Sequence, residues 1–239
     1  MKAKKRVTFF IDADDTLWRD NAYYEQATKA LYREVVIGAS PTYDQFVQKL
    51  NKIETIRCKK LRQYSEKAFI QSLKILCKEY HTHMDERVQG MLYTILEQRQ
   101  KPKLYPHVAK TLRALQKKHG DLYLYTKGKR IDYVQKLKIT ELYPFFRGVI
   151  SCRKSASSFK KILKKLHIQP SEALVIGDSY ANDVLPALAN RVKAIYISNT
   201  EAWTPENPKT ISKKIAKVSF FYQTITLISS YGTTRTVNP

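Results

Sequence analysis

Three carboxylates and a hydroxyl follow directly on an apolar run near the start of the chain. Residues 7–11 are apolar or β-branched, and the run ends in Asp12, Asp14, Asp15 and Thr16. The run is typical of a buried strand. Carboxylates this close together repel one another unless a cation or a basic side chain lies among them. The stretch therefore predicts either a metal site or a solvated acidic turn that leads into a helix.

Two further polar clusters follow apolar runs later in the chain. Thr126 comes after residues 122–125, and Asp178 comes after residues 173–176 and a glycine. Strands that alternate with helices imply a parallel sheet with right-handed crossovers. Ligands bind open α/β sheets at the carboxyl ends of the strands. We therefore expect these two residues and Asp12 to meet at one edge of the sheet.

The elements that position these residues follow from the hydrophobic pattern. Besides the first run, strands are expected at residues 122–125, 148–151, 173–176 and 192–197. Helices of this part are expected at about 108–118, 130–137, 158–166 and 183–189, with an amphipathic end at 218–228. Between the first strand and residue 100 the spacing is helical throughout, with helices at about 21–36, 41–50, 53–61, 66–80 and 85–98.

This arrangement predicts an α/β fold, a Rossmann-like three-layer parallel sheet with an inserted all-helical module. We expect residues 1–18 and 104–228 to form the core, residues 19–103 the helical insertion, and residues 229–239 a polar, flexible tail. The chain of 239 residues is long enough for this division.

The formal net charge of +22 is extreme. Such a charge favours anionic ligands and non-specific contact with nucleic acid. The lysines are spread over several predicted helices, however, and the sequence contains no zinc finger or other nucleic-acid module. A basic protein that binds nucleic acid or an anionic surface stays open as one interpretation, but charge alone assigns no function.

The sequence predicts a cytoplasmic protein without a membrane span, and its oligomeric state is not indicated. No apolar run approaches membrane-spanning length. The three cysteines, Cys58, Cys77 and Cys152, lack paired metal-ligand spacing, which is typical of a reducing compartment.

Four motifs occur in a fixed order along the chain. They are D-x-D-x-T at residues 12–16, Thr126 after its strand, Lys154 ahead of a helix, and the acidic stretch 177–183. In this order they resemble the phosphatase branch of the haloacid dehalogenase-like (HAD) superfamily. The resemblance implies a HAD-like core with a helical cap inserted after the first motif.

The resemblance also implies an Mg²⁺-dependent phosphomonoester hydrolase. Asp12 would attack phosphorus and form an aspartyl-phosphate, and Asp14 would be the general acid and base. Mg²⁺ would be held by the Asp12 carboxylate, the backbone carbonyl of Asp14, and Asp178. Family members that cleave carbon–halogen bonds lack the acid at Asp14, because halide leaves without a proton. A phosphomutase uses the same pair of acids and is the nearest alternative.

Three further residues receive roles from the same resemblance. Thr126 would bind a phosphoryl oxygen, Lys154 would neutralise phosphate and Asp12, and Asp183 would orient Lys154 or metal-bound water. Each has a structural alternative, since Thr126 and Asp183 are also ordinary helix caps and the chain is rich in lysine. Asp15, where many relatives have glycine, is expected to cap the turn.

The substrate is expected to be a small phosphorylated metabolite. Candidate substrate-binding residues are Tyr23, Tyr64 and Lys67 in the helical insertion, and Lys127 beside Thr126. Aromatic and basic groups of this kind hold a ring and an anion. Residues 190–191, Asn-Arg, stand where relatives often have glycine, and Asn190 is expected to supply the left-handed turn.

Overall fold

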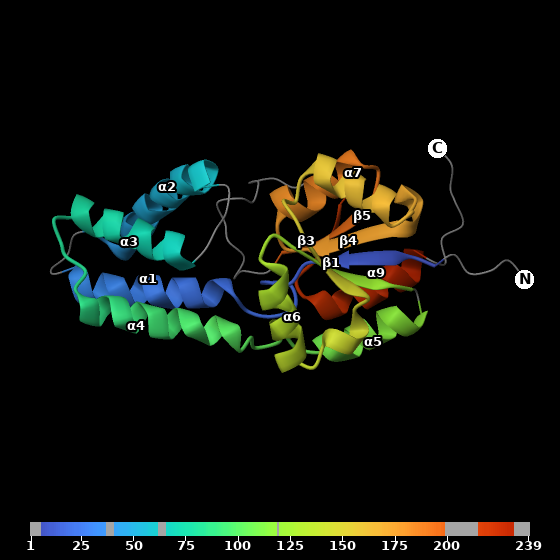
Figure 1. Ribbon diagram of the computed structural model, residues 1–239, viewed down its shortest axis with the longest axis horizontal. Coiled ribbons are helices and arrows are strands. Elements are labelled where there is room, and N and C mark those ends of the chain that lie inside the picture. The colour runs from blue at the N-terminus through green and yellow to red at the C-terminus, as the bar shows by residue number, and fades with distance from the viewer. Residues whose placement is uncertain (1–5, 37–40, 62–65, 119, 199–214, 232–239) are drawn as a thin grey trace, which may run out of the picture. The chain divides into compact units, whose positions relative to one another are not determined.

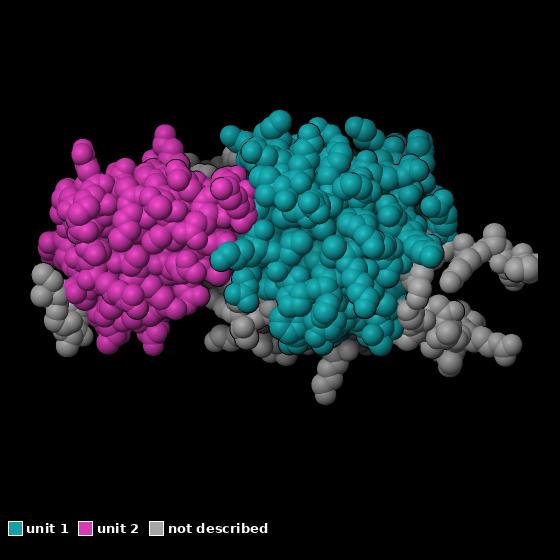
Figure 2. All heavy atoms as spheres, turned by 90° about the horizontal axis from the view of Figure 1, so that it is seen from below, with its two compact units in different colours: residues 1–19, 102–239 teal, residues 20–101 magenta. Residues whose placement is uncertain are grey.

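The computed structural model of the protein describes residues 6–36, 41–61, 66–118, 120–198 and 215–231. The chain forms two compact units. One comprises residues 1–19 and 102–239, and the other residues 20–101 (Figure 2). We call them the α/β unit and the helical unit.

A parallel sheet forms the centre of the α/β unit. Its strands are β1 (Thr8–Ile11), β2 (Leu122–Thr126), β3 (Gly148–Ser151), β4 (Ala173–Gly177), β5 (Lys193–Ile197) and β6 (Ala216–Val218). Their order is β3-β2-β1-β4-β5-β6, and every pairing is parallel. The predicted parallel α/β fold is confirmed. The strand β6 was not predicted, because three residues are too few to reveal an alternating pattern.

Helices cover both faces of the sheet, which gives three layers (Figure 1). One face packs against α5 (Val108–Lys118), α6 (Arg130–Ile139) and α9 (Thr224–Tyr231). The other packs against α7 (Ala156–Lys165) and α8 (Leu185–Ala189). Neighbouring residues of a strand point to opposite faces, so Phe9 and Ile11 belong to the first core and Phe10 to the second.

The chain leaves and re-enters the α/β unit through two paired segments. The backbone N–H of Arg19 donates to Lys103 O at 3.1 Å, and the N–H of Tyr105 donates to Leu17 O at 2.9 Å. Trp18 and Leu104 form an antiparallel bridge between these hydrogen bonds. The two ends of the insertion therefore lie side by side.

The helical unit contains α1 (Asn21–Val35), α2 (Tyr43–Leu61), α3 (Glu66–Glu79), α4 (Glu86–Glu97) and a 3₁₀ turn at Gln98–Gln100, and no strand in its described residues. It has a hydrophobic core of its own. The two helices expected at 41–50 and 53–61 are one continuous helix, α2. Phe46, Leu50 and Ile53 are all buried on one side of it, so the helical face runs unbroken across the expected boundary.

The turn before β5 differs in one residue from the expectation. Arg191, with a φ of 58°, carries the left-handed conformation, whereas Asn190 has a φ of −103°. The amide of Asn190 instead donates to the carbonyls of Ala156 and Pro186, at 2.9 and 2.8 Å. Among the described residues, no helix combines the length and the apolar character needed to cross a membrane.

Candidate active site

Three neighbouring strands bring the predicted residues to the carboxyl edge of the sheet. Asp12 follows β1 directly, Thr126 is the last residue of β2, and Asp178 follows β4. Because β1 lies between β2 and β4, Asp12 is central. After β3 the chain crosses to the other side of β1, and such a switch in strand order is where open α/β sheets bind ligands.

A buried lysine joins two of the carboxylates. Lys154, 7% exposed, precedes α7 and donates its ammonium hydrogens to Asp12 and to Asp183. The Lys154 Nζ–Asp183 Oδ1 distance is 2.6 Å, and the bond to Asp12 Oδ1 is also short. The carboxylates of Asp12, Asp178 and Asp183 each place an oxygen within 4.8 Å of the other two. Three carboxylates thus lie close together, and one ammonium contacts two of them.

The excess of negative charge affects how these groups ionise. Burial raises the pKa of Asp12 to about 7, against the attraction of Lys154, and Asp183 and Asp14 add to the rise. Burial and the neighbouring Asp12, Asp15 and Asp183 raise the pKa of Asp178 well above its usual value. Burial alone would lower the pKa of Lys154, but Asp12 and Asp183 outweigh burial and raise it. The cluster therefore favours a bound proton or a cation.

The position of Asp183 depends on a glycine and an irregular helix. A Cβ at Gly177 would lie 2.8 Å from the Cβ of Asp183 and would overlap its carboxylate. Residues Tyr180–Val184 form a π-helical turn, a distortion that is frequent at functional sites. Asp183 Oδ2 accepts a hydrogen bond from the Ser179 N–H at 3.0 Å. Asp183 is therefore not the cap of α8, and Ser179 caps the turn instead.

The chain makes a tight turn after β1, and Asp15 lies in it. The carbonyl of Ala13 accepts hydrogen bonds from the N–H groups of Thr16 and Leu17, at 3.3 and 2.8 Å. Asp15 is buried at a φ of 54°, a conformation that glycine adopts most easily. Its own N–H donates to Trp18 O at 2.8 Å. Aspartate is one of the few residues besides glycine that adopt this conformation.

The side chain of Asp14 lies in a different environment from the acidic cluster. Its Oδ1 accepts from Trp18 Nε1 at 2.8 Å and from Lys136 Nζ at 3.4 Å, and its Oδ2 accepts from the Tyr133 hydroxyl. The carboxylate of Asp14 is not part of the cluster that could hold a metal. The predicted metal ligand of Asp14 is its backbone carbonyl, which this cluster of side chains does not test, and Asp183 is the third carboxylate of the cluster.

Sequence reasoning missed Tyr133 and Lys136. Both lie on α6, three residues apart, which places them on one face of the helix. A Cβ at Gly128 would overlap the Tyr133 ring, so the glycine after Thr126 and the aromatic residue on α6 fit together. The available signal was Gly128, two residues after Thr126, followed by an aromatic residue and a lysine at helical spacing.

Thr126 and Lys127 occupy the loop after β2. Thr126 is buried, and its hydroxyl accepts from the Gly128 N–H at 3.1 Å. It does not cap α6, whose cap position is Lys129. Lys127 is exposed and donates to Asn182 Oδ1 at 3.2 Å. This bond links the loop after β2 to the π-helical turn after β4.

The other candidate substrate residues belong to the helical unit. Tyr23 is buried on α1 and Lys67 is exposed on α3. Tyr64 lies outside the described residues. Their proposed role in substrate binding stays a prediction.

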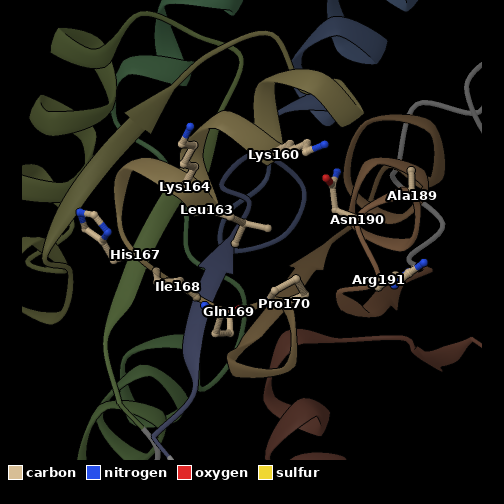
Figure 3. A pocket seen from close by; sticks show the side chains of 10 residues that line it. All are labelled: Lys160, Leu163, Lys164, His167, Ile168, Gln169, Pro170, Ala189, Asn190 and Arg191. Carbon is tan, nitrogen blue, oxygen red and sulfur yellow. The ribbon is translucent and has the colours of Figure 1, made fainter.

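A separate groove of about 580 Å³ runs along α7 and contains none of these residues. Lys160 and Lys164 line it from α7, and Arg191 lines it from the turn before β5 (Figure 3). These basic side chains are exposed, whereas Leu163 beside them is buried. Hydrated basic residues around an open groove are expected on a chain of net charge +22, and we assign the groove no role.

The fold and the site define a class of protein: a parallel α/β fold with acidic side chains at the carboxyl edge of its sheet. The haloacid dehalogenase-like hydrolase family profile matches residues 7–190. The chain belongs to that family, and it is an enzyme.

A relative with a named function and a solved structure agree with this family. The chain is 25% identical over 198 residues to the glyceraldehyde 3-phosphate phosphatase of Methanocaldococcus jannaschii, covering 74% of this chain and 78% of the relative. It is similar in fold to a HAD-like hydrolase of Xanthomonas campestris, with a TM-score of 0.74, 17% identity, and 95% and 96% of the two chains covered.

Two further solved structures share the fold. An L-2-haloacid dehalogenase of Xanthobacter autotrophicus has a TM-score of 0.61 at 16% identity, with 93% of this chain and 98% of the other covered. A putative HAD-hydrolase of Bacillus subtilis, bound to magnesium, has a TM-score of 0.68 at 16% identity and covers 95% and 100%. At this identity the likeness concerns the fold alone.

Proposed function

We propose that the chain is an Mg²⁺-dependent phosphomonoester hydrolase that acts on a small phosphorylated metabolite. The observation that carries the proposal is the cluster of Asp12, Asp178 and Asp183, in which the buried Lys154 contacts Asp12 and Asp183. Three carboxylates and one ammonium leave an excess of negative charge at a ligand-binding edge. A divalent cation would compensate for that excess.

The donor set fits magnesium. Mg²⁺ prefers oxygen ligands and is commonly held by one or two carboxylates together with waters and substrate phosphate. Asp12 and Asp178 would hold the ion with the backbone carbonyl of Asp14, and Asp183 would keep Lys154 in place. When bound, the ion would neutralise the phosphate and the nucleophile, which otherwise repel each other.

The remaining steps fall to residues of this chain. Asp12 attacks phosphorus and forms the aspartyl-phosphate, while Lys154 offsets the charge on the phosphoryl oxygens. Thr126 donates its hydroxyl to one of those oxygens. Asp14 gives a proton to the leaving oxygen and later takes one from the water that hydrolyses the intermediate.

Asp14 favours ester hydrolysis over dehalogenation. A halide leaves without a proton, whereas an alkoxide needs one, so a second acid next to the nucleophile suits a phosphate ester. The name of the Methanocaldococcus jannaschii relative, a glyceraldehyde 3-phosphate phosphatase, supports the same reaction class. No observation favours a phosphomutase or a dedicated nucleic-acid-binding protein over this function.

The helical unit is proposed to be the cap that selects the substrate. A cap of this kind excludes water while the phosphoryl group is transferred. The proposed substrate contacts of this unit are Tyr23, Tyr64 and Lys67. From the α/β unit, Lys127 is proposed to contact the substrate.

A phosphatase screen tests the proposal. Phosphate release is measured with and without Mg²⁺ over sugar phosphates, phosphorylated acids and nucleotides, for the wild type and for Asp12→Asn. We expect Mg²⁺-dependent release that Asp12→Asn abolishes. If the wild type releases phosphate from none of these substrates and binds no Mg²⁺, the proposed function is wrong. Salt-sensitive binding of nucleic acid without turnover would favour the binding protein instead.

A further inference from the structure

The Asp14 carboxylate is held by three donors from two segments of the α/β unit. Trp18 Nε1 lies 2.8 Å from Oδ1, and Lys136 Nζ lies 3.4 Å from the same oxygen. The Tyr133 hydroxyl donates to Oδ2. Both oxygens of one carboxylate are thus fixed at once, which leaves little freedom for rotation about the bond that carries the carboxylate.

The three donors also fix one another. Trp18 is fully buried, and Tyr133 and Lys136 are 7% and 4% exposed. The Trp18 and Tyr133 rings stack with centroids 6.3 Å apart. The Lys136 ammonium lies 5.1 Å from the Tyr133 centroid and 5.8 Å from that of Trp18. A buried lysine between two rings and a carboxylate has its charge compensated and its position defined.

The loop after β2 is shaped to admit Tyr133. Any side chain at Gly128 would overlap the Tyr133 ring. Gly128 also donates its N–H to Thr126, the proposed phosphate-binding hydroxyl. The same short loop therefore serves the phosphate site and makes room for the residue that contacts Asp14.

We propose that Tyr133 and Lys136 are positioning residues that fix the Asp14 carboxyl group in the orientation from which it protonates the leaving oxygen. This inference rests on the proposed function. Each carboxylate oxygen has two lone pairs, so the Tyr133 hydroxyl and the transferred proton can share Oδ2.

The two proton transfers of the reaction require Asp14 to hold the same position in both steps. As Asp12 attacks, the bond from phosphorus to the leaving oxygen breaks, its electron pair stays on that oxygen, and Asp14 supplies the proton. Water then attacks phosphorus and loses a proton to Asp14, and the bond from phosphorus to Asp12 breaks to restore the carboxylate. An Asp14 side chain that swings away between the steps would slow both.

The dependence of kcat/KM on the leaving group distinguishes a loss of Asp14 positioning from general damage to the structure. The value of kcat/KM is compared for glycerol 3-phosphate, whose alkoxide needs a proton, and for p-nitrophenyl phosphate, whose phenolate leaves without one. General acid catalysis contributes roughly 10²–10⁴-fold. We expect Tyr133→Phe and Lys136→Met to lose about 10- to 100-fold on the alkyl ester and less than about threefold on the aryl ester.

Matched controls come from the same region. Lys138→Met changes an exposed lysine of α6, and Tyr143→Phe changes a tyrosine that is 44% exposed. Both should leave the two values of kcat/KM unchanged. Equal losses on both esters for Tyr133→Phe, or an unchanged or faster rate on the alkyl ester, would overturn the inference.

A crystal structure of Tyr133→Phe gives a readout that does not depend on activity. The inference predicts that Asp14 adopts another rotamer or becomes disordered in the variant, while Asp12 and Lys154 stay in place. An Asp14 in its wild-type rotamer overturns the inference. If the wild type hydrolyses no ester of the phosphatase screen and binds no Mg²⁺, the proposed function fails, and this comparison still decides whether Tyr133 positions Asp14.

Discussion

At the scale of single residues, the site is a problem of charge. Asp12, Asp178 and Asp183 lie close together, and Lys154 pairs with Asp12 and Asp183, so one ammonium lies beside three carboxylates. Burial makes each uncompensated charge costly. The same repulsion would favour the binding of a cation.

Replacing Asp178 should therefore preserve or raise the stability of the metal-free protein and abolish its stabilisation by Mg²⁺. Asp178→Asn removes one repelling charge, so we expect the metal-free variant to be at least as stable as the wild type. It should lose the Mg²⁺-induced rise in Tm, which for the wild type at a hundredfold excess over Kd corresponds to about 2.7 kcal/mol. Thermal unfolding with and without Mg²⁺ measures both effects.

Asp132→Asn, an exposed carboxylate on α6, is the control for that experiment and should behave as the wild type. If Asp178→Asn keeps the full Mg²⁺ response, Asp178 is not a ligand.

The raised pKa of Asp12 predicts a dependence of stability on pH in the absence of metal. Its pKa is about 7 in the folded chain, against an ordinary value of 3.8. Between these values the folded state holds a proton that the unfolded state has released. This group should therefore lower the free energy of unfolding as pH rises from about 4 to about 7.

Urea unfolding from pH 4.5 to pH 8 in EDTA measures this slope, and Asp12→Asn, which removes one of the two raised carboxyl pKa values, should make it shallower. Identical slopes for the two proteins would mean that Asp12 ionises normally in the fold.

At the scale of elements, strand ends place the chemistry. The apolar runs before Asp12, Thr126 and Asp178 predicted β1, β2 and β4, and the structure confirms them as neighbouring parallel strands. Helix boundaries were also readable where a cap was present: Asp85 accepts from the Val88 N–H at 2.7 Å at the start of α4. Local pattern and turn chemistry were sufficient for these elements.

Other features depend on contacts that local pattern does not reveal. The strand β6 forms because it pairs with β5. The π-helical turn at Tyr180–Val184 places the Asp183 side chain directly against Gly177. Tyr133 and Lys136 reach Asp14 from 119 and 122 residues away. Nothing in the sequence around Asp14 points to either residue.

The close approach of β4 and the π-helical turn gives a stability prediction. A methyl group in Gly177→Ala would overlap the Asp183 carboxylate, and Asp183 cannot retreat without breaking its bond to Lys154. We expect a loss of about 1–3 kcal/mol in urea unfolding. Gly148→Ala in β3 is the control, since its Cβ would meet only the Tyr123 ring at 3.9 Å and should change stability by less than about 0.5 kcal/mol. Equal effects of the two substitutions would refute the packing explanation.

At the scale of the whole molecule, each unit has its own hydrophobic core. The two segments that lead to the helical unit are hydrogen-bonded to each other within the α/β unit. A short linker from Arg19 to Pro102 should therefore bridge the insertion without distorting the sheet.

A chain shortened in this way separates metal binding from substrate selection. We expect it to fold and to keep the Mg²⁺-induced rise in Tm, because Asp12, Asp178 and Lys154 all belong to the α/β unit. Its kcat/KM on the best substrate of the full chain should fall by about 10²-fold or more, because the cap no longer excludes water. Undiminished turnover with unchanged selectivity would show that the helical unit is not the cap.

The central claim is that Asp12 carries the phosphoryl group during turnover. The most direct measurement quenches the enzyme with acid during turnover of a phosphate ester, reduces it with borohydride and maps the modified residue by mass spectrometry. Borohydride reduces an acyl phosphate to the alcohol, so an aspartyl-phosphate becomes homoserine. Homoserine at position 12, dependent on substrate and Mg²⁺ and absent when either is omitted, is the predicted result. Turnover that leaves position 12 unmodified, or that places the modification on another aspartate, would contradict the mechanism.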